Sequence, residues 1–309
     1  MKNTVSLPRV NSEALAAYAE SEGISSFAAK PSFSKLEKAF LVSLVEDVQS
    51  LNLIDSMRLN FSPRFPVLGT SSAKTEKGET KGWLTGICYL SPAKVSGFFN
   101  LCAWAGNCKA LCLDTAGKGG MDYVQKQRKL KTARLAFYGP EVFLLNAILD
   151  LRSILVSASN KGYSVAVRLD GTSDIGLVNY PLQCFGNKSI AEIFPSVSFY
   201  EYTKSAERML SFLRGEMLPN VHFTFSHDGE NNVKNALNVE RILKAGGSVA
   251  VCFSGSIPET WKGYPVINGD ETDLRFLDRS EGLQGAFIVG LKAKGKAKKV
   301  RNGFVVESF

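Results

Sequence analysis

Hydrophobic positions follow two alternating patterns over most of this chain. Short apolar runs predict β-strands, and the stretches between them, in which apolar residues recur at helical spacing, predict helices. The expected strands are 83–90, 164–169, 197–202, 221–226, 248–253, 265–267 and 286–291. The expected helices are 120–134, 140–159, 190–194, 205–214 and 231–244. Strands that alternate with helices in this way indicate a parallel sheet with crossover helices.

The first part of the chain has a different pattern. Asn11 precedes an alanine-rich segment and predicts a capped helix, and residues 34–59 carry apolar positions at helical spacing. Residues 69–81 are rich in Ser, Thr, Lys and Gly and predict a flexible polar linker. We therefore expect a helical amino-terminal region over 1–68, the linker, and an α/β domain over 82–309.

The α/β domain is expected to form a partial (βα) barrel of about six units, because that is how many strand–helix pairs the pattern supports. Its first strand-to-helix turn carries cysteines, whereas a dinucleotide-binding fold carries Gly-x-Gly-x-x-Gly at that point. The pattern therefore favours a barrel-like fold over a dinucleotide-binding fold.

Three cysteines lie close together in that first turn. Cys102, Cys108 and Cys112 are separated by five and three residues. Three thiolates can hold one metal centre and leave a coordination position open, as reactive centres do. Three alternatives remain: a 4Fe–4S cluster with one open iron, a zinc ion with Cys88 or His222 as fourth ligand, and a loop without metal.

The arrangement of this cysteine loop resembles that of radical S-adenosylmethionine enzymes. There, three cysteines on a loop after the first barrel strand hold an iron–sulfur cluster, although a shorter spacing is usual. The resemblance implies a 4Fe–4S cluster and S-adenosylmethionine as cofactors, and zinc is the alternative cofactor.

Polar residues follow the expected strands where each one ends, and the carboxyl ends of parallel strands form the active face of such folds. We expect Tyr202, Lys204 and His227 to act as catalytic residues, with Ser226 also facing the substrate. The residues expected to line the cosubstrate pocket are Gly117, Lys118, Gly119, Arg168, Asp170, Thr172, Ser173 and Asp174. The glycines of this set would act through their backbone amides.

A few other chemically active side chains have simpler interpretations. Asp270, Glu271 and Asp273 form an acidic group that either binds a hard cation or pairs with nearby Lys and Arg. Cys184 and Cys252 are isolated from the other thiols and are expected to be buried and unreactive.

The chain carries a net charge of +8, and the excess is concentrated in two stretches. Residues 118–134 and 291–301 hold most of the clustered Lys and Arg. Such stretches suit a nucleic acid, a nucleotide or another phosphate, and they also suit a solvated surface. No ladder of aromatic residues is interleaved with them, as a single-strand-binding surface would require.

No uninterrupted apolar run approaches the roughly 18 residues that a bilayer-spanning helix needs. The first residues also lack the apolar core of a signal peptide. We therefore expect a cytoplasmic protein that does not contact a membrane.

Several motifs together resemble a bacteriophage family known as gene product 88. They are the cysteine loop and residues 84–93, 127–132, 168–174, 200–204, 224–226 and 269–278. The resemblance covers about residues 65–300. It implies a phage protein that acts in the host bacterial cytoplasm, and it implies no activity.

The sequence leads to two hypotheses for function. The first is a phage-encoded iron–sulfur enzyme of the radical S-adenosylmethionine type that acts on a nucleotide or nucleic acid. The alternative is a phage factor without catalytic activity that binds nucleic acid or a host protein, its cysteine loop held by zinc or free of metal. A metal-free hydrolase or transferase that uses the 117–120 loop is a third class.

Overall fold

The fold is known from a computed structural model that describes residues 8–22, 33–44, 64–112, 114, 116–279, 282–299 and 303–308. The expected helix over 34–59 is confirmed in its first part as α2 (Lys35–Ser43), whereas its remainder from residue 45 lies outside the described residues. The capped helix after Asn11 is α1 (Ser12–Ser21), and the Asn11 side chain accepts a hydrogen bond from the Ala14 amide.

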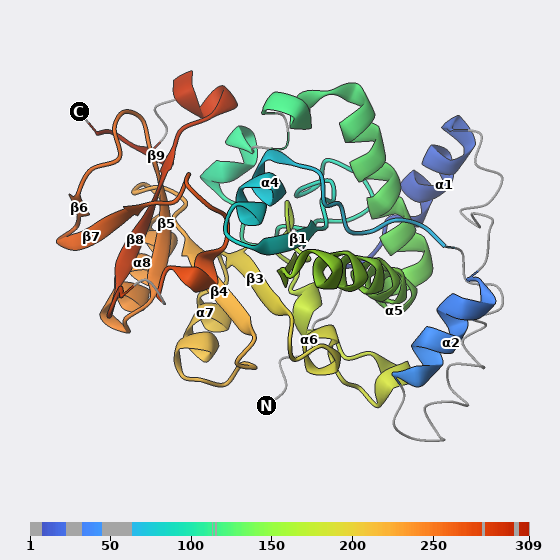
Figure 1. Cartoon of the computed structure of the whole chain (residues 1–309). Coiled ribbons are helices and arrows are strands. Elements are labelled where there is room, and N and C mark those ends of the chain that lie inside the picture. The colour runs from blue at the N-terminus through green and yellow to red at the C-terminus, as the bar shows by residue number, and fades with distance from the viewer. Residues whose placement is uncertain are drawn as a thin grey trace.

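One sheet of nine strands organises the described part of the chain (Figure 1). The strands are β1 (Trp83–Ile87), β2 (Ser164–Arg168), β3 (Ser198–Thr203), β4 (Val221–Ser226), β5 (Ser248–Phe253), β6 (Thr260–Trp261), β7 (Tyr264–Asn268), β8 (Phe287–Lys292) and β9 (Val305–Val306). Their order is β1-β2-β3-β4-β5-β8-β7-β6, with β9 beside β5. All pairings are parallel except that of β6 with β7. The predicted parallel α/β sheet is confirmed.

The sheet is open within the described residues, because its path ends at β1 on one side and at β6 on the other. Closure into a barrel is therefore not confirmed. The sequential order of β1 to β5 still places the loops that follow these strands side by side along one edge.

Helices connect the strands where the hydrophobic pattern predicts them. They are α5 (Asp122–Lys161), α6 (Ile190–Ile193), α7 (Ala206–Leu213) and α8 (Val233–Lys244). The two helices expected between the first strands form one element, α5, that is broken at Gly139. Gly139 has φ +76° and precedes Pro140, which lacks an amide to continue the helix, so both residues favour the break.

The two faces of the sheet have different neighbours. Val165, Val167 and Phe199 belong to the main core, which contains the buried side chains of α5, α7 and α8. Ala166 and Tyr200 alternate with them, as strand geometry requires, and join a second cluster with Leu274. Helices therefore cover one face, and the other face turns its side chains toward the loops and the cavity described below.

The polar segment over 69–81 is more regular than a linker. Residues 73–79 form helix α4 (Ala73–Glu79), whose N-cap Ser72 makes a capping box with Thr75. In Figure 1, α4 lies above β1, whereas α6 and α7 lie below the sheet. The expected irregular conformation is corrected here, because the sequence signal of the capping box outweighs the polar composition.

Helix α5 is the one helix among the described residues that is long and apolar enough to cross a membrane by length and composition alone. Its side chains Leu144, Ile148 and Leu151 are fully buried in the main core. Packing against the sheet thus accounts for its apolar character as that of a core helix.

Candidate functional site

A cavity of about 380 Å³ lies at the carboxyl ends of the strands. Its walls include Arg168 from β2, Tyr202 from β3, Ser226 from β4, Cys252 from β5 and Leu291 from β8. The polar residues that follow β2, β3 and β4 therefore meet at one place, as the phase of strands and polar clusters predicts.

All three cysteines of the loop after β1 line this cavity. Cys108 lies in a short 3-10 helix, Asn107–Leu111, and Cys102 and Cys112 flank it. Each thiol is partly buried. The loop thus brings Cys102, Cys108 and Cys112 to one wall of one cavity.

The side chain of Asp228, just after β4, holds the cysteine loop in place. Its carboxylate accepts hydrogen bonds from the amides of Asn107 at 2.9 Å and Cys108 at 3.1 Å, and from the Asn232 side chain at 2.7 Å. A Cβ atom on Gly106 would lie 2.1 Å from the carboxylate, so only glycine allows this approach. Asp228 therefore caps the 3-10 helix from the loop that follows β4.

Cys102 is held by the loop after β2. Its sulfur accepts a hydrogen bond from the Ala93 amide at 3.3 Å and lies 3.7 Å from the Thr172 carbonyl oxygen. The Thr172 hydroxyl donates to the Leu90 carbonyl at 2.5 Å, which fixes this loop against the end of β1. Thr172 therefore lines the cavity and also positions the first cysteine.

Burial keeps the three thiols protonated at neutral pH. It raises the pKa of Cys102 to about 12 and that of Cys112 to about 11, and it also raises the pKa of Cys108. Burial opposes the charge of Lys204, but Cys108, Asp228 and Asp174 together raise the pKa of this lysine. A positive charge thus stands beside Cys108, where it favours thiolate formation.

The donor set suits a soft metal in kind, because thiolates are the ligands of iron–sulfur clusters and zinc. No group of three or more His, Cys, Asp or Glu residues in the part of the chain that the structure describes is arranged to hold a metal ion. Cys88 is fully buried, and the His222 ring packs 5.5 Å from that of Phe276. Neither of these two residues, expected as a fourth zinc ligand, lines the cavity.

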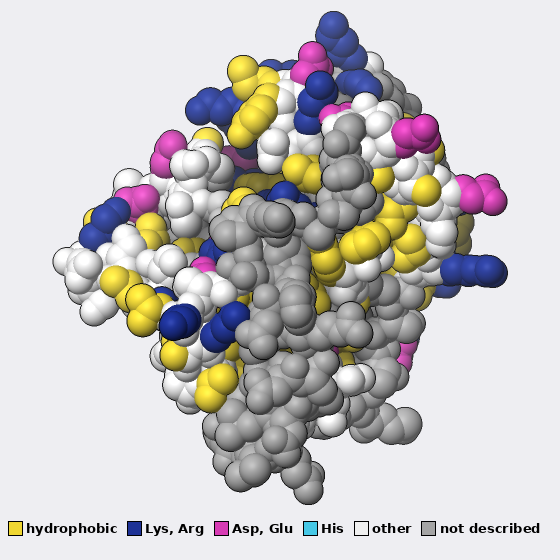
Figure 2. Space-filling view, turned by 90° about the vertical axis from the view of Figure 1, so that its right-hand side faces the viewer, with side chains coloured by type: hydrophobic (Ala, Val, Ile, Leu, Met, Phe, Trp, Pro, Cys, Tyr) yellow, Lys and Arg dark blue, Asp and Glu magenta, His cyan; other side chains and the backbone are white. Residues whose placement is uncertain are grey.

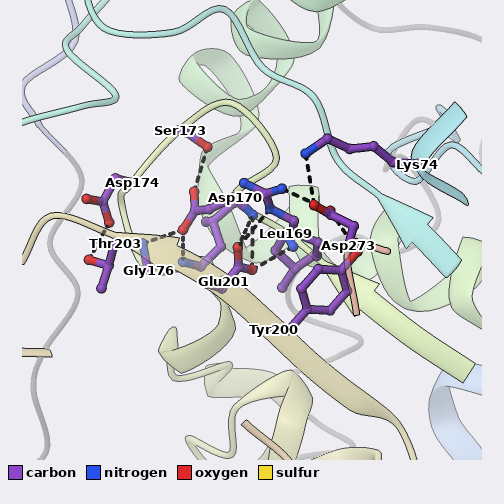
Figure 3. Close-up of polar contacts among 12 residues, drawn as sticks. Lys74, Leu169, Asp170, Ser173, Asp174, Gly176, Tyr200, Glu201, Thr203 and Asp273 are labelled. Carbon is purple, nitrogen blue, oxygen red and sulfur yellow. Dashed lines mark hydrogen bonds and ion pairs between the residues drawn. The ribbon is translucent and has the colours of Figure 1, made fainter. Parts of the chain in front are cut away.

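A buried ion network forms another part of the cavity wall (Figure 3). The guanidinium of Arg168 donates to Asp273 at 3.1 Å, and Lys74 and the Tyr200 hydroxyl bind the same carboxylate at 3.0 Å and 3.2 Å. Burial opposes the charge of Asp273, but Lys74 and Arg168 lower its pKa to about 2. Glu201 accepts from the amides of Leu169 and Asp170 beneath it.

Two carboxylates after β2 are fully used within the protein (Figure 3). Asp170 accepts from the Ser173 hydroxyl and the Gly176 amide, both at 2.6 Å, and it does not line the cavity. Asp174 does line the cavity, and it accepts from Thr203 at 2.9 Å and from the Lys204 amide at 2.8 Å. Asp170 therefore shapes the loop, whereas Asp174 joins that loop to the end of β3.

A family model described as gene product 88 matches residues 67–307. The chain belongs to this bacteriophage family. The match confirms the resemblance carried by the sequence motifs and covers the α/β domain together with α4. No curated protein and no solved structure matches the chain. The comparisons give no support to the expected likeness to radical S-adenosylmethionine enzymes.

Two groups of expected site residues of this family member lie away from the cavity. His227 has a side chain that is only 1% exposed, and its ring packs edge-on against Trp261 at 5.5 Å. Gly117, Lys118 and Gly119 form a 3-10 turn in which the Gly119 amide already donates to Ala116. Neither the imidazole nor the glycine loop lines the cavity, so their expected contacts with substrate or phosphate find no support in their positions.

The acidic group after β7 pairs with cations, as one of its two interpretations predicts. Asp273 takes part in the Arg168 network, and Asp270 binds Lys294 at 2.6 Å. Asp270 also accepts the Lys292 amide at 3.0 Å. These bonds make the group part of the cavity wall and leave no observation that favours a hard cation there.

Several lining residues were not expected from the sequence. They are Lys74 and Lys77 of α4, Asp114, Cys252, and Lys292 and Lys294 at the end of β8. Cys252 was expected to be buried and unreactive, yet it is half-buried and lines the cavity. The alternation of side chains along β5 could have predicted this position. Cys252 lies on the same face of the strand as Ala250, whereas Val251 lies on the opposite face in the main core.

Proposed function

We propose that this phage protein is an iron–sulfur enzyme of the radical S-adenosylmethionine type. It would act on a nucleotide or nucleic acid in the cytoplasm of the bacterial host. The observation that carries the proposal is the position of Cys102, Cys108 and Cys112 on one wall of a cavity at the carboxyl ends of parallel strands. The sequential order of β1 to β5 supports a partial barrel as the frame of this site.

In this proposal, Cys102, Cys108 and Cys112 are the cluster ligands. When bound, a 4Fe–4S cluster would supply the electron for reductive cleavage of S-adenosylmethionine into methionine and a carbon-centred radical. The thiols must lose their protons on binding, because thiolates are the ligands. Lys204 lies beside Cys108 and stabilises the negative charge that forms there.

The remaining residues of the cavity wall would position a ligand beside the thiols. Asp174 and Thr172 belong to the loop that is fixed to Cys102 and to β3, so a ligand beside the thiols would meet a preformed surface. Tyr202 lines the cavity, and the guanidinium of Arg168 lies 4.6 Å from the centroid of its ring. Lys204, Tyr202 and Ser226 are the side chains that we place against the substrate.

The decisive experiment is anaerobic reconstitution of the full chain with iron and sulfide. We expect bound iron and sulfide, a broad absorbance near roughly 400 nm from thiolate-bound iron, and cleavage of S-adenosylmethionine after reduction. The triple variant Cys102→Ala, Cys108→Ala, Cys112→Ala should lose all three signals. Cys184→Ala is the matched control, because Cys184 is fully buried and does not line the cavity. A wild-type protein that takes up no iron would overturn the proposal.

One observation favours the alternative, a binding protein without catalytic activity. Within the described residues the three sulfurs do not form a group arranged for a metal, and burial keeps them protonated. This alternative predicts either stoichiometric zinc or no metal in protein purified without oxygen. Elemental analysis of that protein separates the two functions.

A further inference from the structure

Five cationic side chains gather on one part of the cavity wall. They are Lys74, Lys77, Arg168, Lys292 and Lys294, named here the cationic wall. Lys74 and Arg168 share the carboxylate of Asp273, while Lys77 donates to the Asp270 carbonyl and Lys294 to its carboxylate. Asp273 therefore joins α4 to β2 through its carboxylate, and Asp270 joins α4 to the segment after β8 through its carbonyl and carboxylate oxygens.

The cationic wall holds more positive charge than its carboxylates balance. Asp270, Asp273 and Glu201, which lies 4.0 Å from the Arg168 guanidinium, offset three of the five cations, which leaves an excess of two. Among the described residues, the ammonium group of Lys292 has no ion-pair partner, and its side chain is exposed at the rim. An uncompensated cluster inside a cavity attracts an anion more strongly than dispersed surface lysines do.

Apolar groups adjoin the cationic wall within the same cavity. Leu291, Ala297 and Phe304 line it, together with the ring of Tyr202. A ligand that matches this surface carries a highly charged anionic group on an apolar or aromatic body. Phosphate esters of nucleosides have this combination, whereas inorganic anions lack the body.

We infer that the cationic wall is the binding site for the phosphate groups of the substrate. This inference deepens and rests on the proposed function, since it assigns the substrate class of the same cavity. The cysteine trio faces the reacting part of the molecule, and the cationic wall holds its phosphate. On the side of the protein drawn in Figure 2, Lys and Arg lie among Asp and Glu over the part that is not grey.

The short helix after β8 extends this charge out of the cavity. Lys296, Lys298 and Lys299 lie exposed on the 3-10 helix Gly295–Lys299, while Ala297 of the same helix is buried against the cavity. A nucleic-acid strand whose terminal phosphate sat on the cationic wall would continue along these lysines. A free nucleotide would not reach them, so the two sources of phosphate are distinguishable.

The first test measures binding of tripolyphosphate and of nucleoside monophosphates to the full chain by calorimetry. We expect saturable binding that the double variant Lys292→Gln, Lys294→Gln weakens about tenfold or more, because each cation contributes to the same phosphate site. Lys244→Gln is the matched control, since this lysine is 77% exposed on α8, away from the cavity. Saturable binding that is equal in wild type and the double variant would overturn the inference, as would an absence of saturable binding.

A second variant is expected to strengthen phosphate binding, a result that an unfolded protein could not produce. Asp270→Asn removes the carboxylate that competes for Lys294 and keeps an oxygen to accept the Lys292 amide. It should bind tripolyphosphate about three- to tenfold more tightly, as expected for one added unit of positive charge near a phosphate. Weaker binding by this variant would contradict the inference.

Titration of a single-stranded oligonucleotide at several salt concentrations distinguishes a nucleic acid from a free nucleotide as the ligand that carries the phosphate. If nucleic acid is the substrate, Lys296→Gln, Lys298→Gln, Lys299→Gln weakens oligonucleotide binding and leaves mononucleotide binding unchanged, and the slope against salt falls by about two. If a free nucleotide is the substrate, this triple variant behaves as wild type. Both outcomes support the cationic wall, provided that Lys292→Gln, Lys294→Gln impairs binding.

These measurements use protein without a cluster, so their failure is separate from failure of the proposed function. The Cys102→Ala, Cys108→Ala, Cys112→Ala variant should bind phosphate like wild type. A protein that takes up no iron but binds phosphate at the cationic wall would contradict the proposed iron–sulfur function and support the phosphate site. A protein that takes up iron but does not bind phosphate would support the proposed function and contradict the phosphate site.

Discussion

The cavity has two parts that are stabilised in opposite ways. Around Arg168, nearly every charge has a partner within the protein: Asp273 binds two cations, and Glu201 accepts two amides. Around Cys108, Asp228 accepts the backbone amides of Asn107 and Cys108, and burial raises the pKa of the thiols. One part is thus held by ion pairs between side chains, and the other by a carboxylate that binds backbone amides.

The difference teaches how a site can be recognised before its ligand is known. A perturbed pKa at Asp273 reflects ion pairs that complete the wall, whereas the raised pKa values of Cys102 and Cys112 reflect burial without a cation. A shifted pKa is found both at Asp273 and at the cysteines, so the shift alone does not distinguish them. The ion pairs and hydrogen bonds that each side chain makes within the protein distinguish them. Four predictions break or sharpen this comparison.

The largest effect is expected at the ion network. Arg168→Met removes the cation that separates Asp273 from Glu201 and should lower the free energy of unfolding by about 3–5 kcal/mol, because a buried carboxylate loses its partner. Urea denaturation of the full chain measures it. A loss below about 1 kcal/mol would mean that this part of the wall is not preformed.

Acid should destabilise the protein through two buried histidines that lie outside the cavity, while the ion network keeps its charges. Burial lowers the pKa of His227, which lies beside Asp228, to about 4, and that of His222 to about 4 as well. Both imidazoles are neutral when folded and take up a proton on unfolding below their ordinary pKa. The stability that each contributes is present above about pH 6.5 and falls by about 2–3 kcal/mol as the pH drops to 4. Asp273 keeps its charge over that range.

The measurement is the urea midpoint between pH 7 and pH 4.5 for wild type, His227→Gln and His222→Gln. Each variant should show a shallower decline than wild type, because one group that takes up a proton on unfolding is gone. Three identical slopes would contradict the burial of the neutral rings.

A smaller effect is expected where Asp228 holds the cysteine loop. Asp228→Ala leaves the amides of Asn107 and Cys108 without their acceptor and should cost about 1–2 kcal/mol. It should also reduce iron uptake in reconstitution, since the loop loses its position. Asp228→Asn keeps one oxygen as acceptor and serves as the control. Full iron uptake by the alanine variant would show that the ligands need no preformed loop.

The smallest effect on stability is expected at the thiols themselves. In protein without a cluster, the triple alanine variant of Cys102, Cys108 and Cys112 should unfold within about 1 kcal/mol of wild type, because these side chains are only partly buried. Thermal unfolding of the two proteins checks this. A loss as large as that of Arg168→Met would make the trio structural and remove the contrast between the two parts.

The sequence predicts local structure here better than it predicts the cavity wall. Strands β2 to β5 and helices α7 and α8 follow from hydrophobic period, which is a local property. Lys74 and Lys77 lie in a polar segment whose ordinary composition carries no sign that it faces Asp270 and Asp273, nearly 200 residues later. Contacts at that separation depend on strand order, which the pattern of one chain leaves open.

The two basic stretches illustrate the same limit. In 118–134, Arg128 donates to the Asp114 carbonyl at 2.7 Å and Lys131 to the Val67 carbonyl, so part of the expected polyanion surface is turned inward. In 291–301, Lys292 and Lys294 line the cavity, and Arg301 lies outside the described residues. Two stretches of equal charge density therefore have different structural roles. The direction in which each side chain points from its helix or strand determines that role.

The β1 side of the sheet is joined to the segment after β7 by side-chain contacts, and no backbone–backbone hydrogen bond links the two among the described residues. Lys74 beside β1 binds Asp273 after β7, and the ring of Trp83 packs 4.7 Å from that of Phe276. Relative movement of these two segments would break only side-chain contacts and would leave every strand pairing among the described residues intact.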